Sequence, residues 1–360
     1  MTAAFAPAMA RRHLRLQRSA ILAALGAFLA IVFIMAVGMG AVPIPASKVV
    51  AILLDAVGLP IGIEFEGRDR AIVWAIRLPR ACLGVLIGAG LALSGALLQG
   101  LFRNPLADPQ LIGVSGGAAF AAVATIVLGH SVLRPFTEAL GSYALPVAAF
   151  AGCLATTGLM YRLSTVDGRT FVATMLLSGI AINALAMAGM GFFIFMSDDR
   201  QLRDITFWMM GSLGGATWSQ VATILPFIAL PGLLVAYLAR ALNAFILGER
   251  EAVHLGFDVE TTKFVAIGAV ALSVGASVAM AGVIGFIGLV VPHLVRLVAG
   301  ADHAIVLPAS ALAGATLILM ADLVARTAVV PAELPIGLVT SAIGGPFFLW
   351  LLVSRRRDLG

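Results

Sequence analysis

Long apolar runs dominate this chain, and short polar stretches separate them. At about 1.5 Å of rise per residue, a helical run of some 20 residues crosses a hydrocarbon core about 30 Å thick. The pattern therefore predicts an all-α polytopic membrane protein with ten transmembrane helices, organised as one domain over residues 1–360. The ten runs cover approximately residues 19–40, 81–102, 111–129, 143–160, 171–196, 219–239, 264–284, 286–298, 305–325 and 336–353.

The polar stretch from 99 to 110 interrupts two of the most apolar runs. It carries Arg103 and Asn104 just before Pro105, and Asp108 just before Pro109. Proline removes a backbone donor and disfavours the helical conformation of the residue before it. We therefore expect one helix to end near Phe102 and the next to begin after Pro109, with a short loop at one membrane face between them.

Composition supports a lipid environment and argues against a nucleic-acid partner. Hydrophobic residues make up 61% of the chain, charged residues 11%, and the mean hydropathy is +1.06. A soluble chain carries about 25% charged residues. The net charge of +5 could suggest nucleic acid, but the arginines cluster at the ends of apolar runs. Cys82 and Cys153 both lie inside apolar runs and are interpreted as two buried thiols.

Charge at the two ends of the chain predicts the orientation. Residues 1–18 carry four arginines ahead of the first apolar run, which is too long for the core of a signal peptide. Ten crossings return the C-terminal Arg355-Arg356-Arg357 to the same side of the membrane. Because basic residues favour the cytoplasmic face, both termini are predicted to be cytoplasmic.

A short sequence pattern that occurs twice indicates an inverted repeat. The pattern Gly-Ala-x-x-Ala-x-x-Gly occurs at 88–95 and again at 275–282, in the second and seventh runs. The predicted topology orients these two runs in opposite directions, as an inverted repeat requires.

The inner polar region, residues 240–262, is too long for a simple turn. Four polar or charged residues alternate there with Ala252 and Leu255, before a glycine at 256. This spacing predicts a short amphipathic helix that ends at Gly256. Such a helix either binds a cytoplasmic partner or is simply solvated.

Motifs for catalysis, nucleotide binding and metal binding are missing from the sequence. It has no Gly-x-x-x-x-Gly-Lys-Ser/Thr loop, no His-Glu-x-x-His, no Cys-x-x-Cys and no Gly-x-Ser-x-Gly. An intramembrane enzyme would need carboxylates, histidines or metal ligands inside the runs. A proton-driven secondary transporter would need acids in the middle of them, and runs two to seven carry none. The sequence therefore argues against an enzyme and against a proton-driven transporter.

Five further motifs together resemble one family, the permease subunits of type II ATP-binding-cassette importers for iron-siderophores, haem and vitamin B12. In chain order they are Arg77-Leu-Pro-Arg80, Asn104-Pro-Leu-Ala-Asp-Pro109, Leu247-Gly-Glu with Leu255-Gly256, Gly285-Phe-Ile-Gly-Leu-Val-Val-Pro-His293 and Glu333-Leu-Pro-Ile-Gly337. The resemblance implies a homodimer in a bacterial inner membrane, with two cytoplasmic ATPase subunits and a periplasmic binding protein. ATP and Mg would be bound by the ATPase subunits, and this chain would hold no cofactor or metal.

The stretch from Arg203 to Trp218, together with Leu101-Phe-Arg-Asn-Pro105, is most similar to haem importers. Ferric-siderophore and cobalamin import remain alternatives within the family. No histidine is clearly placed in a central path. The methionines Met187 and Met190 are candidates to contact substrate there, although packing between helices explains them as well.

The resemblance also implies roles for three groups of residues. Arg77, Arg80 and Arg326 would receive acidic residues of the binding protein, unless they only anchor helix ends among lipid headgroups. Asn104 and Leu106 would form a cytoplasmic gate, unless Asn104 only caps the following helix, since asparagine before proline often starts a turn. A coupling helix would contact the ATPase and would involve Gly248, Glu249, Arg250, Ala252, Leu255 and Gly256.

Overall fold

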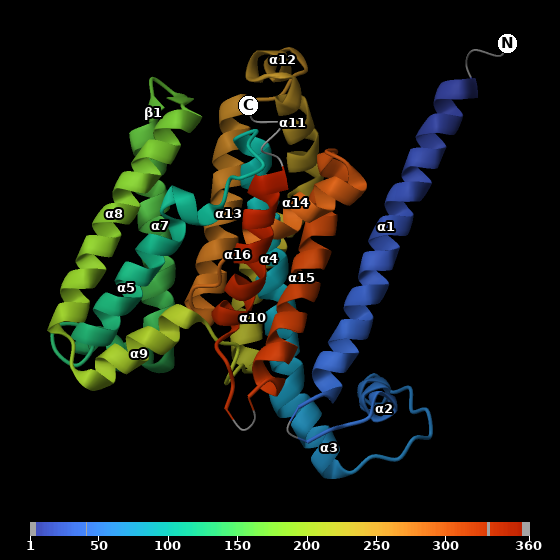
Figure 1. The fold of residues 1–360 in the computed structure, drawn as a ribbon, viewed down its shortest axis with the longest axis vertical. Coiled ribbons are helices and arrows are strands. Elements are labelled where there is room, and N and C mark those ends of the chain that lie inside the picture. Colours follow the sequence, from blue (N-terminus) through green and yellow to red (C-terminus); the bar gives the residue numbers. More distant parts are fainter. Residues whose placement is uncertain (1–4, 41, 330–331, 355–360) are drawn as a thin grey trace.

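The computed structural model describes residues 5–40, 42–329 and 332–354, and most of them are helical (Figure 1). The first half contains α1 (Phe5–Gly38), α2 (Ala46–Ala56), α3 (Gly67–Ile72), the π-helix η1 (Val73–Arg77), α4 (Leu78–Leu101), the 3-10 helix η2 (Pro109–Ile112), α5 (Val114–Leu128), α6 (Arg134–Leu140), η3 (Gly141–Tyr143) and α7 (Ala144–Ser164). The second half contains α8 (Val172–Met196), α9 (Asp199–Met210), α10 (Trp218–Leu233), α11 (Val235–Leu247), α12 (Glu249–His254), α13 (Val259–Ala281), α14 (Ile287–Ala299), α15 (His303–Thr327) and α16 (Ile336–Ser354).

Each of the ten predicted runs coincides with a helix, but the helices differ in length. Within the described residues, six helical segments are long and apolar enough to cross a membrane, and a bent pair makes up to seven. Shorter apolar helices occupy three of the predicted runs: Val114–Leu128, Ile287–Ala299 and Ile336–Trp350. The structure therefore establishes a multi-pass helical protein, while the count of ten crossings stays a prediction.

Two helices depart from the continuous spans that the sequence predicts. The sixth run is broken into α10 and α11, which meet at an angle of 47°. Pro231 lies one turn before the break, where a missing amide and a bulky ring interrupt the helical hydrogen bonds. The second run begins earlier than expected, because a single helical segment covers Gly67–Leu101. Inside it the amide of Leu78 donates to the carbonyl of Val73, five residues back, just before Pro79.

Helix α4 lies at the centre of the bundle and packs by backbone contact (Figure 1). In the most apolar 18-residue stretch of the segment Gly67–Leu101, 78% of the residues are buried. The corresponding share for the peripheral α1 is 17%. A Cβ atom added at Gly88 would lie 2.3 Å from the carbonyl oxygen of Gly314 in α15. One added at Gly95 would lie 1.8 Å from that of Gly288 in α14. These glycines of the first repeat copy therefore let three helices approach more closely than side chains would allow.

The second copy of the repeat has a different environment. Gly275 faces the sulfur of Cys153, at 2.8 Å from an added Cβ, and Gly282 ends α13 with a φ of +75°. Both cysteines are free thiols; Cys153 is buried as predicted, whereas Cys82 is only half-buried. Helices α4 and α13 run in opposite directions, since Arg80 near the start of α4 lies at one end of the bundle and Lys263 near the start of α13 at the other.

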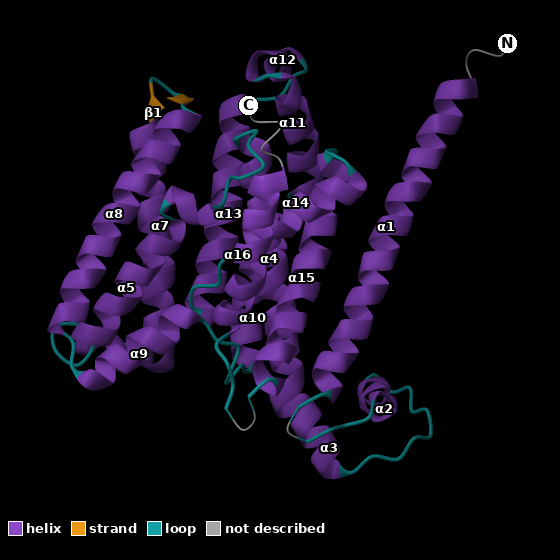
Figure 2. Cartoon of the chain, viewed as in Figure 1, coloured by secondary structure: helices purple, strands orange, loops and turns teal. Residues whose placement is uncertain are grey.

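The two ends of the bundle carry different small elements (Figures 1 and 2). One end carries α12 and a two-stranded antiparallel hairpin, β1 (Thr165–Val166) and β2 (Arg169–Thr170). The described N-terminal part of α1 points to the same end. Arg355, Arg356 and Arg357 lie outside the described residues. Helices α2, α3 and α9 lie toward the opposite end. We call the end that carries α12 and the hairpin the inner end, and the end that carries α2, α3 and α9 the outer end.

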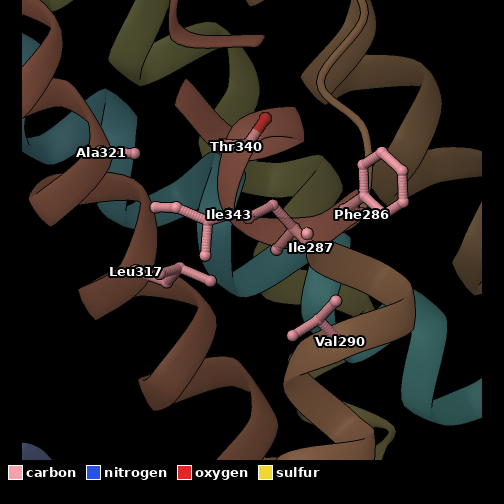
Figure 3. Close-up of a pocket in the computed structure, with 8 residues that line it drawn as sticks. Phe286, Ile287, Val290, Leu317, Ala321, Thr340 and Ile343 are labelled. Carbon is pink, nitrogen blue, oxygen red and sulfur yellow. The ribbon is translucent and has the colours of Figure 1, made fainter. Parts of the chain in front are cut away.

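The glycine-rich motif before α14 forms a tight packing site (Figure 3). Phe286 has a φ of +68°, which is unusual for a residue other than glycine. A Cβ at Gly344 of α16 would lie 2.3 Å from the Cβ of Phe286, so only glycine fits opposite it. The cavity in Figure 3 has a volume of about 10 Å³ and is lined mostly by apolar side chains. It has room for one water molecule at most and is not a substrate site.

Candidate functional site

At the outer end, Arg80 holds two helices and a loop together. Its guanidinium donates to Asp322 of α15 at 2.9 and 3.0 Å and to Glu333 of the following loop at 2.9 and 3.0 Å. Side chains of Arg80 and Asp322 are 13% and 3% exposed, whereas that of Glu333 is 47% exposed. Because guanidinium and carboxylate are both planar, these paired bonds also fix the relative orientation of the groups.

The other two predicted docking arginines also face into the protein. Arg326 lies 3.6 Å from Asp322, one turn away on α15, and donates to the carbonyl of Ala36 near the end of α1. Arg77 is buried and donates to the carbonyls of Val37 and Gly38 at 2.9 and 2.7 Å. The arginines therefore link the end of α1 to α4 and α15.

This geometry changes what can be expected of each arginine. The structure brings Arg80 and Arg326 together around Asp322, but Arg77 points instead to the end of α1. Arg77 is the last residue of the π-helical turn η1, whereas Arg80 lies in the first turn of α4. Arg77 is buried and paired with backbone acceptors, and the side chain of Arg326 is only 8% exposed. The docking role of all three arginines stays a prediction.

Glu333 is the exposed member of this cluster, and sequence reasoning gave it no role. Glu333 belongs to the Glu333-Leu-Pro motif, but its partner Arg80 lies 253 positions away in the sequence. The hydrogen bond from Arg80 lowers the pKa of the Glu333 carboxyl below its ordinary value. The carboxylate is therefore charged at neutral pH.

At the inner end, the predicted amphipathic helix is present as α12, over six residues. Gly248 and Gly256 flank it with φ values of +127° and +87°, which favour glycine. Ala252 is fully buried, while Val253 and Leu255 are 56% and 59% exposed. The expected glycine stop is confirmed, but Leu255 does not share the buried face of Ala252. The role of this helix in coupling stays a prediction.

A buried lysine joins α12 to the rest of the inner end. Lys263 of α13 donates to Glu249 of α12 at 2.9 Å, to the carbonyl of Thr170 in β2 at 2.8 Å and to Glu260 at 3.3 Å. The Glu260 carboxylate in turn accepts from the amide of Thr170 at 2.9 Å. We call these four residues the Lys263 node. Its lysine side chain is 3% exposed, whereas Glu249 and Glu260 are 39% and 32% exposed.

A groove of about 730 Å³ lies beside the Lys263 node. It separates α12 and the hairpin from the end of α4, so it borders both the predicted coupling helix and the predicted gate loop. Three arginines line it, Arg103, Arg169 and Arg250, and all three are exposed. Since the node already pairs Glu249 and Glu260, the unpaired charge facing this groove is mainly positive.

The loop predicted to form a gate is shaped by its own side chains. Asn104 is exposed and accepts a hydrogen bond from the amide of Leu106 at 2.9 Å, two residues on. Asp108 accepts from the amide of Gln110 in the same way, at 2.8 Å, and starts η2. Asn104 thus closes a local turn, while the residue that caps the following helix η2 is Asp108. A gate between subunits stays a prediction.

The two candidate path methionines have opposite environments. Met187 is 60% exposed on α8, whereas Met190 is 8% exposed and packs with Ala119, Val123 and Ile205. Met190 therefore matches the packing alternative, and Met187 is available on the outer surface of this subunit. Among the residues the structure describes, no three side chains of histidine, cysteine, aspartate or glutamate come together as a metal site.

Comparisons with known proteins agree with the motifs. A model of the FecCD transport family matches residues 17–354. The hemin transport system permease protein HmuU of Yersinia pestis is 49% identical over 289 residues, which are 79% of this chain and 84% of that protein. The cobalamin import system permease protein BtuC of Halobacterium salinarum is 42% identical over 316 residues, 88% of this chain and 81% of that protein.

Two further matches cover similar lengths. The vitamin B12 import system permease protein BtuC of Shigella boydii is 43% identical over 300 residues, 83% of this chain and 89% of that protein. Among solved structures, a metal-chelate-type ABC transporter in an inward-facing conformation superposes with a TM-score of 0.80 and 31% identity. That match covers 93% of this chain and 99% of the other.

Proposed function

From the premise that this chain belongs to the FecCD transport family, we propose that it moves haem into the cytoplasm as the permease subunit of an ATP-driven importer. The observation that favours haem is the 49% identity to a hemin permease, compared with 42% and 43% for two cobalamin permeases. Ferric-siderophore or cobalamin import by the same mechanism is the alternative.

We further propose that the working unit is a homodimer in a bacterial inner membrane. Each subunit would cross the membrane ten times as one permease domain and have both termini in the cytoplasm. Two ATPase subunits, which would themselves bind ATP and Mg²⁺, would dock at the inner end. A periplasmic binding protein would deliver haem at the outer end. The positions of α12 at one end and of the Arg80 cluster at the other support this arrangement.

Each end then has a defined task in the proposal. An acidic group of the binding protein would compete with Glu333 for Arg80, because Glu333 is exposed and Asp322 is buried. At the inner end α12 would contact the ATPase through its exposed apolar residues Val253 and Leu255. Asn104 and Leu106 would close the path between two subunits. The chain performs no covalent chemistry, and packed helices shift around the path as the ATPase turns over.

Transport in a reconstituted system tests the proposed substrate. The permease, its ATPase and its binding protein are placed in proteoliposomes and offered haem, a ferric siderophore or cobalamin in parallel. We expect ATP-dependent accumulation of haem, and vesicles without internal ATP are the control. Accumulation of only one of the other two ligands would show that the substrate proposal is wrong. Uptake that a protonophore abolishes and ATP removal does not would contradict an ATP-driven importer.

A further inference from the structure

Between α1 and η1 the chain forms a small outer lobe, residues 42–72, which has no part in the site described above. It consists of α2, an extended loop and α3 (Figure 1). Helix α2 buries Val49, Ala51 and Ile52 on its inner face. The lobe therefore has a folded base, and the loop extends from that base.

The tip of this lobe is apolar and uncovered. Every residue from 56 to 64 is exposed, and no charged residue occurs before Glu64. The side chains at alternate positions are aliphatic, with exposed fractions of 69%, 62%, 47% and 38% for Val57, Leu59, Ile61 and Ile63. Such a continuous uncharged run is unfavourable in water and usually marks a surface that something covers.

Four charged residues of the lobe are paired at its base. Lys48 pairs with Asp69 at 2.9 Å, and Arg70 pairs with Asp55 at 3.3 Å, so α2 is tied to α3. Arg77 then fastens this base to the end of α1 through two backbone carbonyls. The apolar tip is thus held at a fixed place relative to a membrane-spanning helix.

The position of the lobe indicates what covers the tip. The apolar window of α1 ends at Gly38, only a few residues before the lobe begins. Figure 1 views α2 nearly end-on, whereas α1 runs along the page, so α2 lies across the direction of the span. The loop extends sideways from the bundle, beyond α1. A helix across the span, at the level where the span ends, has the geometry of a segment lying in the membrane interface.

We propose that residues 57–63 insert into the interfacial region of the outer leaflet, so that the partner of this surface is lipid. The charged base would remain at the level of the headgroups while Leu59 and Ile61 reach the acyl chains. A protein that docks on the Arg80 cluster would cover the end of the bundle, whereas the loop of this lobe extends sideways beyond α1 (Figure 1). The proposal depends on the membrane location of the chain and is independent of the transported substrate.

Spin labels that report depth can test this. Cys82→Ser and Cys153→Ala provide a background without native thiols, into which Leu59→Cys is introduced and labelled in lipid nanodiscs. Ile31→Cys, on the exposed face of α1, is the membrane reference, and Arg200→Cys, on α9, is the aqueous reference. We expect the label at 59 to collide several-fold more often with dissolved oxygen than with a water-soluble nickel chelate. In the same background Ile61→Asp should move the label toward water, and Ile61→Val should not.

Three results would overturn the proposal. The label at 59 could match the aqueous reference in lipid. It could become shielded from nickel only when the periplasmic binding protein is added, which would assign the tip to a protein partner. It could also show dipolar broadening from a second label, which would place the tip against another copy of this chain.

Discussion

The Arg80 cluster at the outer end and the Lys263 node at the inner end use the same chemistry for different purposes. In each, a buried cation is shared between two carboxylates. Around Arg80 the groups belong to two long helices and the loop that follows one of them. Around Lys263 they belong to a long helix, the six-residue α12 and, through Thr170, a two-stranded hairpin.

The difference shows that an ion pair is only as rigid as the elements that carry it. Helices α4 and α15 are held together along their length, by Gly88 and Gly314 among others, so the Arg80 cluster fixes a joint that is already tight. Helix α12 is only six residues long and packs mainly against the preceding α11, so the Lys263 node adds the tie that joins it to α13 and the hairpin. Burial differs as well, because Asp322 is 3% exposed while Glu249 and Glu260 are about a third exposed.

The largest effect should follow from Asp322→Ala. This change leaves the guanidiniums of Arg80 and Arg326 buried with one acid fewer, and removing one partner of a buried ion pair costs about 3–5 kcal/mol. We expect a markedly lower unfolding temperature of the permease in detergent. Glu333→Ala is the matched control, because its exposed pair is worth only about 0.2–1 kcal/mol. Equal losses for the two variants would contradict the difference in burial.

An intermediate effect on stability, with a large effect on coupling, should follow from Lys263→Met. Glu249 and Glu260 can still be hydrated, so we expect a loss of about 1.5–3 kcal/mol, as for hydrogen bonds to charged groups. Stimulation of ATP hydrolysis by the loaded binding protein should fall about fivefold or more, which is the lower range of typical coupling between sites. Lys263→Arg should restore most of it.

A second variant separates this prediction from the proposed docking of α12. Arg250→Glu changes an exposed charge on α12 and leaves the Lys263 node intact. Arg250→Glu could weaken copurification with the ATPase while Lys263→Met retains normal stimulation of ATP hydrolysis. In that case α12 docks on the ATPase, but the Lys263 node is not needed for coupling. If Arg250→Glu changes neither copurification nor stimulation, the coupling role of α12 itself is wrong.

The smallest effect concerns pH at the outer end. Arg80 lowers the pKa of Glu333 in the folded protein below its ordinary value of 4.5. As pH falls, the unfolded carboxyl therefore binds its proton first. The stability that this pair contributes is present above pH 4.5 and is lost as pH falls through the lowered pKa. Unfolding temperatures of the parent and of Glu333→Gln should thus converge on acidification. A constant difference from pH 6 to pH 3 would refute the pairing.

Local pattern was sufficient for the features that depend on neighbours in sequence. The ten apolar runs, the loop between Pro105 and Pro109 and the stop at Gly256 all follow from periodicity, proline and glycine. The close approach of Gly88 to Gly314 explains why glycine stands at this position of the repeat. Sequence alone does not identify Gly314 as the residue that it contacts. The same holds for Arg77, for Glu333 and for the bond from Lys263 to Thr170, because these partners come from elements distant in sequence.

The contacts of α4 with α14 and α15 also limit how the bundle can change shape. Where Gly95 meets Gly288 and Gly88 meets Gly314, main chain touches main chain, and no side chain can rotate to let one helix slide past the other. Displacement along these two seams would separate the backbones and open a void with nothing to fill it. The three helices therefore behave as one solid block. Any widening of a passage must come from boundaries where side chains take part in the contact, such as that between α5 and α8, where Gly189 faces the ring of Phe120.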